Sequence, residues 1–62
     1  MKILVIFYID TVLDGGQKHL IPYPPNVGDF VEIDKNVYIV DSRIFVYESG
    51  SAPLVKIYLK AL

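Results

Sequence analysis

Four clusters of turn-forming residues divide this 62-residue chain into five short apolar runs. The clusters lie at residues 14–16, 24–29, 35–36 and 49–53 and are rich in Gly, Pro, Asn, Asp and Ser. The runs between them are dominated by Val, Ile, Tyr and Phe, which fit the pleated surface of a β-sheet. Short runs of this composition, separated by turn signals, predict an all-β chain with five strands.

Size and composition limit how such a chain is stabilised. A single domain over residues 1–62 buries only about 60% of its unfolded surface, and without cysteine it has neither disulfides nor thiolate metal sites. The apolar content of 53% must therefore supply the stability. The longest apolar run, residues 3–9, is shorter than the roughly 20 residues of a membrane helix and does not resemble a signal peptide. We expect a cytoplasmic protein that does not contact the membrane.

The segment at residues 22–30 is expected to end one strand and begin the next. Its three prolines cannot donate hydrogen bonds to a β-ladder, so the preceding strand stops there. Gly28 can adopt a positive φ, and Asp29 can accept hydrogen bonds from nearby backbone N–H groups. The chain therefore reverses direction, and a new strand starts at Phe30.

This segment also contains a motif. The pattern P-x-V-G-D-x-V-x-I at residues 25–33, followed by Y-x-V at residues 38–40, resembles the central part of small SH3-like barrels. Such barrels occur in many short bacterial and phage proteins of unknown role, including products of mobile gene cassettes. The resemblance covers residues 22–62 and implies a small five-stranded antiparallel SH3-like barrel. Because this fold hosts many unrelated functions, the resemblance implies no site residues.

A two-residue loop at residues 35–36 predicts the register of the first hairpin. In that register Ile33 faces Tyr38 and Val31 faces Val40, and facing residues share one side of the sheet. These apolar residues fall on a single inner side, which makes the register self-consistent. The other side holds the alternate residues of both strands, namely Phe30, Glu32, Asp34, Ile39 and Asp41.

A tip at residues 49–52 predicts the register of the second hairpin, in which Val46 faces Val55. The inner row then comprises Val40, Ile44, Val46, Val55, Ile57 and Leu59. Ser42 is the polar exception in this row. It is expected to mark a bulge or a bend, where the strand passes from one half of a barrel to the other.

The opposite side of the second hairpin is expected to face solvent. Its aromatic residues are Phe45, Tyr47 and Tyr58. The predicted register places Asp41 beside Lys60 as an ion pair, and Arg43 beside Tyr58 as a cation–π contact. Both contacts are typical of a solvated surface.

In the first strand the odd positions from Ile3 to Ile9 are expected to face the core. The even positions are expected to face outward, because Lys2 and Asp10 close that row at its two ends. The outward residues between them are nevertheless apolar. In an SH3-like barrel the first and last strands are neighbours, so these residues would join the outward aromatic residues. The resulting stripe comprises the predicted partner-binding residues Leu4, Ile6, Tyr8, Phe45, Tyr47 and Tyr58.

An outward apolar stripe of this extent usually marks a partner site. It predicts a non-enzymatic protein–protein interaction module, most simply a homodimer that uses the same patch twice. Two other interpretations remain open. Scattered surface apolar residues need no function, and the loop at residues 10–20 could fold over part of the stripe.

Two further binding modes compete with self-association. Nucleic acid could stack on Phe45, Tyr47 and Tyr58, flanked by the basic residues Lys56, Lys60 and Arg43. The net charge of −1 argues against this alternative, since phosphate attraction normally dominates such affinity. Capture of a proline-rich peptide is the other mode, with the aromatic residues Tyr8, Tyr23 and Tyr47.

Candidates for catalysis are few. His19, the only histidine, would need an acid or a nucleophile in reach, and the nearest candidates along the chain are Asp10 and Asp14. Their spacing fits no calcium loop and no zinc pattern, so we expect a loop histidine in water. None of the serines lies in a nucleophile-elbow motif; they are Ser42, Ser49 and Ser51. We therefore expect no enzymatic activity, no metal and no cofactor.

Overall fold

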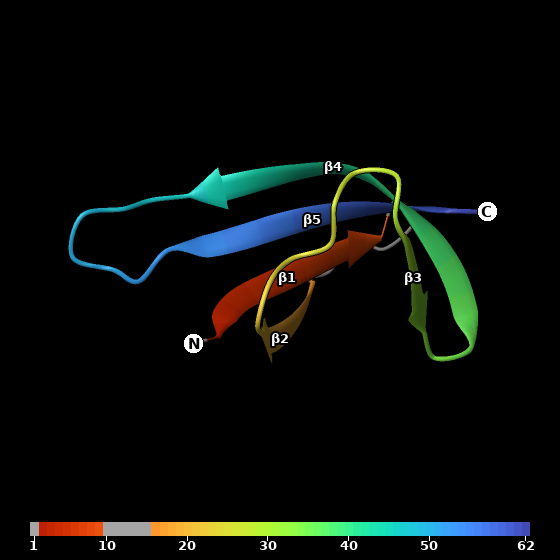
Figure 1. The fold of residues 1–62 in the computed structure, drawn as a ribbon, viewed down its shortest axis with the longest axis horizontal. Helices are drawn as coiled ribbons and strands as arrows, with labels where there is room; N and C mark the ends of the chain where they lie inside the picture. The colour runs from red at the N-terminus through yellow and green to blue at the C-terminus, as the bar shows by residue number, and fades with distance from the viewer. Residues whose placement is uncertain (1, 10–15) are drawn as a thin grey trace.

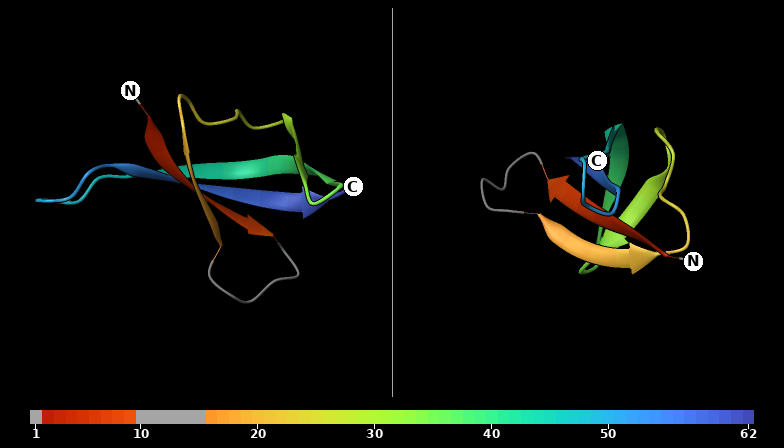
Figure 2. Two further views of the ribbon diagram at one scale, coloured as in Figure 1. Left: turned by 90° about the horizontal axis from the view of Figure 1, so that it is seen from below. Right: turned by 90° about the vertical axis from the view of Figure 1, so that its left-hand side faces the viewer.

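The structure is a computed structural model that describes residues 2–9 and 16–62. It contains five strands: β1 (Ile3–Ile9), β2 (Gln17–Ile21), β3 (Phe30–Ile33), β4 (Asn36–Val46) and β5 (Leu54–Ala61). They form one sheet in the order β2-β1-β5-β4-β3, which curls into a half-barrel (Figures 1 and 2). The predicted all-β fold with five strands is confirmed, and it is consistent with a small SH3-like barrel. Within the described ranges, no helix has the length and apolar character needed to cross a membrane.

The first and last strands are neighbours, as expected, but they run in the same direction. β1 pairs with β5 in parallel from Leu4 opposite Leu54 to Ile9 opposite Leu59, whereas the other three pairings are antiparallel. The expectation of a wholly antiparallel barrel is therefore wrong. The reason is geometric, because in five strands that alternate in direction the first and the fifth point the same way, so placing them side by side makes a parallel pair.

The core lies on the inner, concave side of this sheet. Its buried residues are Val5, Phe7, Val40, Val55, Ile57 and Leu59. They come from the odd positions of β1 and β5 and from the centre of β4, and the inward rows predicted for the first and last strands are confirmed. Burial of each such side chain contributes about 1.5–3 kcal/mol, so this small cluster accounts for much of what holds the sheet together.

The first hairpin turns one residue earlier than predicted. Ile33 pairs with Asn36, so the loop is Asp34-Lys35, whose φ angles of 51° and 70° are those of a type I′ turn. Val31 consequently faces Tyr38 instead of Val40. The observed partner lies two residues away from the predicted one, and side chains alternate with a period of two. Every side chain is therefore on the side of the sheet that was predicted for it. The predicted inner side of this hairpin is therefore correct, although its loop is not.

A bulge at Asp41 changes the second hairpin more seriously. Val40 faces Leu59 but Ser42 faces Tyr58, so Asp41 has no partner in the ladder. One extra residue in a strand reverses the side of every residue beyond it.

Past the bulge, Phe45 faces Val55 on the inner side and Ile44 faces Lys56 on the outer side. The predicted inward positions of Ile44 and Val46 are therefore wrong. The outward position predicted for Phe45 is wrong as well. The bulge lies beside Ser42, the residue whose polarity had suggested an irregularity at this point.

Residues 22–29 leave β2 at the first proline, as predicted, and cross the open side of the half-barrel (Figure 2). The Gly28 amide donates to the Val40 carbonyl at 3.0 Å, and the Val40 amide donates to the Asp29 carbonyl at 2.9 Å. Gly28 has a φ of 95°, and the Asn26 amide donates to Asp29 Oδ2 at 2.8 Å. The roles predicted for Gly28 and Asp29 in this reversal are confirmed.

Arg43 provides a second attachment for this segment. Its Nη1 donates to the Pro25 carbonyl at 3.2 Å, and its guanidinium carbon lies 5.1 Å from the ring centroid of Phe45. The predicted cation–π contact of Arg43 with Tyr58 is therefore wrong, because the bulge moves Arg43 to the inner side.

Candidate functional site

The side of the sheet opposite the core is called the outer face here. Over β2, β1, β5 and the part of β4 beyond Asp41, its side chains form three rows that run across the strands, because paired residues share a side. The first row is entirely aliphatic and comprises Leu20, Leu4, Leu54 and Val46. Leu20 is 64% exposed, while the other three are partly buried. The row is uninterrupted over four strands, and none of its side chains is charged.

The second row alternates between lysine and isoleucine. Its members, in order across β2, β1, β5 and β4, are Lys18, Ile6, Lys56 and Ile44. Ile6 is only 8% exposed although it lies outside the core cluster. The aliphatic stems of the flanking lysines are placed to cover it, while their ammonium groups reach solvent. Ile44, next to the far lysine, remains 50% exposed.

The third row is built around two stacked tyrosines. Tyr8 and Tyr58 are partners in the parallel register, and their ring centroids lie 5.2 Å apart with an interplanar angle of 17°. Ser42 continues the row on β4. Beyond it, Lys60 Nζ lies 3.5 Å from Asp41 Oδ1, which confirms the predicted ion pair. The two side chains are 55% and 48% exposed, so this pair contributes at most about 1 kcal/mol.

The six residues predicted as partner-binding are divided between two sides of the sheet. Four of them come together in the three outer rows: Leu4, Ile6, Tyr8 and Tyr58. Phe45 lies apart from them on the inner side, where it is 44% exposed. Tyr47 follows the end of β4 and is 75% exposed. The predicted stripe therefore exists in part, without two of its aromatic residues.

Leu20 and Ile44 belong to the outer face but were not predicted. Ile44 was assigned to the inner row because the irregularity expected at Ser42 was not applied to the register of the residues beyond it. Leu20 lies in β2, in a stretch that was interpreted as a loop. The stretch Lys18-His19-Leu20-Ile21 has two polar residues followed by two apolar ones, so its pattern does not indicate a strand.

The residues considered for nucleic-acid binding do not form one surface. Arg43 and Phe45 are on the inner side, whereas Tyr58 and Lys56 are on the outer face. Lys60 is paired with Asp41. The set considered for proline-rich peptides is dispersed as well: Tyr8 is in β1, Tyr23 is in the segment across the open side, and Tyr47 follows β4.

His19 lies in β2 and not in a loop, and it is exposed. Its Nε2 is 3.4 Å from Oε1 of Gln17, and its ring meets Phe7 edge-on with centroids 5.7 Å apart. Asp10 and Asp14, the two acids considered with it, lie outside the described residues. The suggested cover over the stripe also falls largely in residues 10–15, outside the described part.

The three serines considered for catalysis lie in two separate places. Ser42 sits on the outer face beside Tyr58, and Ser49 and Ser51 lie in the exposed tip between β4 and β5. Comparison with protein-family models, with curated proteins and with solved structures finds no significant match to this chain.

Proposed function

We propose that this chain is a non-enzymatic, cytoplasmic protein–protein interaction module that self-associates through the outer face. The supporting observation is the continuity of the three outer rows across β2, β1, β5 and β4. Two exposed aliphatic residues, Leu20 and Ile44, flank partly buried ones in these rows. Exposed apolar surface that is continuous over several strands is more typical of an interface than of solvated surface.

The charge of the outer face is compatible with this proposal. Its three rows contain two ionised side chains, Lys18 and Lys56, and the Asp41 carboxylate beside the third row is paired with Lys60. Long lysine side chains can extend to the rim of an interface while their stems remain on apolar surface. A two-fold symmetric contact would bring the same rows of two copies together.

The size of the outer face sets the strength of the contact. Four strands at about 4.8 Å spacing and three rows of alternate residues cover roughly 400 Å². A stable interface usually buries about 800 Å² per partner. We therefore expect a weak dimer with a dissociation constant in the range of about 10 μM to 1 mM.

Sedimentation velocity tests the proposal over a concentration series from about 10 μM to 1 mM. The weight-average mass should rise from the 7.0 kDa of one chain toward twice that value. A constant monomer mass up to the highest concentration would contradict self-association. If the monomer then retained a labelled oligonucleotide at low salt, the nucleic-acid alternative would replace it.

A pair of charge variants locates the contact. Ile44→Glu places a carboxylate opposite Lys56 in the chain's own sheet, so it should not harm the fold. It also places that charge in the proposed interface, where it should weaken dimerisation by at least about tenfold. Val27→Glu is the matched control, because Val27 is similarly exposed at 58% but lies in the segment across the open side. Equal effects of the two variants would exclude the outer face.

A further inference from the structure

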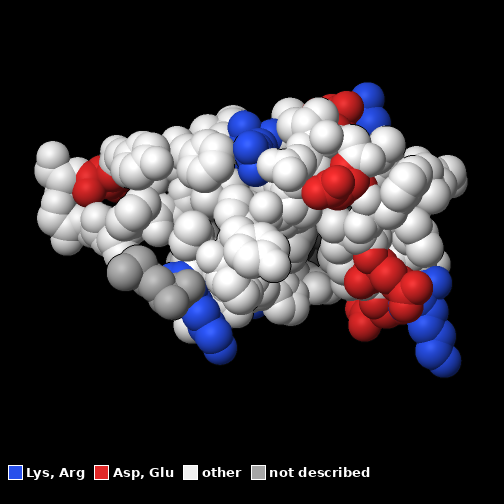
Figure 3. Space-filling view, in the orientation of Figure 1, with Lys and Arg blue, Asp and Glu red and all other residues white. Residues whose placement is uncertain are grey.

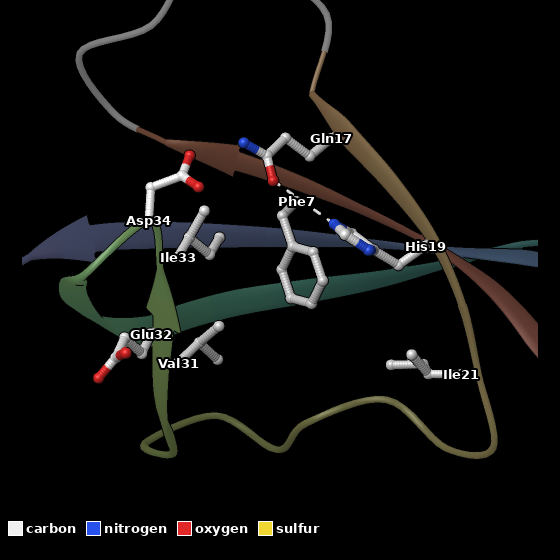
Figure 4. Close-up of a pocket in the computed structure, with 8 residues that line it drawn as sticks. All are labelled: Phe7, Gln17, His19, Ile21, Val31, Glu32, Ile33 and Asp34. Atoms are coloured by element: carbon white, nitrogen blue, oxygen red, sulfur yellow. Dashed lines mark hydrogen bonds between the residues drawn. The ribbon is translucent and has the colours of Figure 1, made fainter.

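The curl of the sheet brings its two edge strands, β2 and β3, to opposite sides of one cleft. The cleft has a volume of about 340 Å³ and is lined by residues of β1, β2, β3 and the turn after β3. In Figure 4 the ribbons of β2 and β3 stand on either side of it, with the Phe7 ring between them. The cleft is therefore the gap between the two edge strands, where the half-barrel is not closed.

The interior of the cleft is apolar. Phe7 forms its floor and is 8% exposed, and the side walls are formed by Ile21, Val31 and Ile33. These aliphatic residues border the core without being fully buried. Apolar side chains from a ligand would extend the core here.

The rim of the cleft is polar and asymmetric in charge. Gln17 and His19 lie on the β2 side, and Glu32 and Asp34 lie on the β3 side. Among the described residues that line the cleft there is no Lys or Arg to neutralise the two carboxylates. Acidic atoms gather at the β3–β4 hairpin end of the molecule, with basic atoms beside them (Figure 3). A cationic group is the complementary partner for this rim.

Both walls also present free backbone edges. β2 pairs only with β1, and β3 pairs only with β4. Within residues 2–9 and 16–62, each of these strands therefore has one edge of N–H and C=O groups with no ladder partner, which is a template for an added strand. The cleft combines an apolar floor, an acidic rim and free strand edges, and an extended peptide matches all three.

We propose that the cleft binds an extended segment of a partner protein, which adds to the free edge of β3 as a strand with alternating apolar and basic residues. Val31 and Ile33 face the inner side, so the residues of an added strand opposite them also face inward and pack toward Phe7. Glu32 lies between them and faces the other side, so its cross-strand neighbour should be Lys or Arg. This proposal does not depend on self-association through the outer face.

The test is titration of the isotope-labelled chain with the blocked peptide Ac-Val-Lys-Val-Lys-Val-NH2, followed by NMR. We expect saturable shift changes for the amides of β3 and for Phe7 and His19. Binding should weaken with added salt. No shift change in β2 or β3, or changes confined to the outer face, would overturn the proposal.

Three control ligands separate the components of recognition. A peptide with Glu in place of Lys tests the charge, and a peptide N-methylated at alternate amides tests the backbone pairing. Lysine amide alone tests whether the cleft is merely a cation site. Each control should bind at least about fivefold more weakly than the Val-Lys peptide. Equal binding of any one of them would overturn the proposal.

Variants of the chain test the same contact without disturbing its core. Glu32→Gln combined with Asp34→Asn removes the charge of the rim and should reduce affinity about 3- to 10-fold. Both residues are exposed, and Asn readily adopts the positive φ of position 34. Glu48→Gln, at the distant tip after β4, is the matched control and should leave affinity unchanged. An equal loss in the control would overturn the assignment of the cleft.

Discussion

Tyr8 stacks on Tyr58 across the only parallel pair of strands in the described sheet, at 5.2 Å between centroids and 17° between ring planes. The two rings belong to strands at opposite ends of the chain, and both are partly buried. This contact therefore reports directly on whether β1 is docked against β5.

A double-mutant cycle should measure the energy of that contact. Tyr8→Leu and Tyr58→Leu remove the rings singly and together, and chemical denaturation gives the free energy of unfolding of each variant. We expect a coupling energy of about 0.5–1.5 kcal/mol, the usual value for an aromatic pair. Additivity of the two single effects within about 0.3 kcal/mol would show that the rings do not interact. The measurements belong at low protein concentration, where association is negligible.

Arg43 should hold the segment at residues 22–29 against the sheet. Replacing it with Met removes the hydrogen bond to the Pro25 carbonyl, and we expect a loss of about 1 kcal/mol. Hydrogen exchange of the Gly28 amide, which donates to the Val40 carbonyl, should accelerate about fivefold. Arg43→Lys is the control that retains the charge without the planar donor group. Unchanged exchange in the Met variant would mean that the other contacts of this segment order it without Arg43.

Lys35 occupies a backbone conformation that favours glycine. Its φ of 70° lies in the left-handed region, in the second position of the type I′ turn. We expect Lys35→Gly to raise the free energy of unfolding by about 0.5–1 kcal/mol, because relief of the steric cost exceeds the entropy lost by glycine. Lys35→Ala retains a Cβ and should bring no gain. Thermal unfolding of the two variants compares them, and a gain with Ala would point instead to the lost lysine charge.

Gly16 lies where the chain enters β2, at close approach to β1. A Cβ at this position would meet the carbonyl group of Phe7, with the carbonyl carbon at 2.9 Å, and would lie 3.0 Å from Cγ2 of Ile6. We expect Gly16→Ala to destabilise the chain by about 1–3 kcal/mol and to shift the resonances of β1. Gly50→Ala is the comparison, since a Cβ there meets no atom within 4 Å and only the positive φ of 81° opposes it. The Gly50 variant should leave β1 unchanged.

The alternation of apolar residues was sufficient to predict much of this fold. The inward row of β5 follows from alternation in Val55-Lys56-Ile57, and that of β1 follows from Lys2 and Asp10 at the two ends of its even row. Both rows agree with the observed burial. The turn at Asp34-Lys35 was missed because a shift of two residues in pairing leaves every side chain on its predicted side. The hydrophobic pattern cannot distinguish two registers that bury the same residues.

The inward and outward sides of β4 beyond Asp41 could not be predicted for the opposite reason. Both alternating sets there contain apolar residues, with Ile44 and Val46 in one set and Phe45 in the other. The unpaired Asp41 decides which set faces the core. The polar Ser42 indicated an irregularity here, but it did not show whether the strand bends or gains an extra residue. The predicted partner-binding residues contain the same error, because Phe45 was expected on the same side of the sheet as Tyr58. The cleft between β2 and β3 depends on how far the sheet curls, which no local pattern reports.

The parallel pairing of β1 with β5 also determines when this molecule can fold. Leu4 meets Leu54 only after Leu54 has left the ribosome, and closing so long a loop slows folding compared with forming a local hairpin. Until then Val5 and Phe7 lack the neighbour against which they are buried. The nascent chain should therefore pass through an intermediate in which apolar residues of β1 are exposed because β5 is not yet available. The yield of folded protein should then depend on chaperones and on the rate of translation.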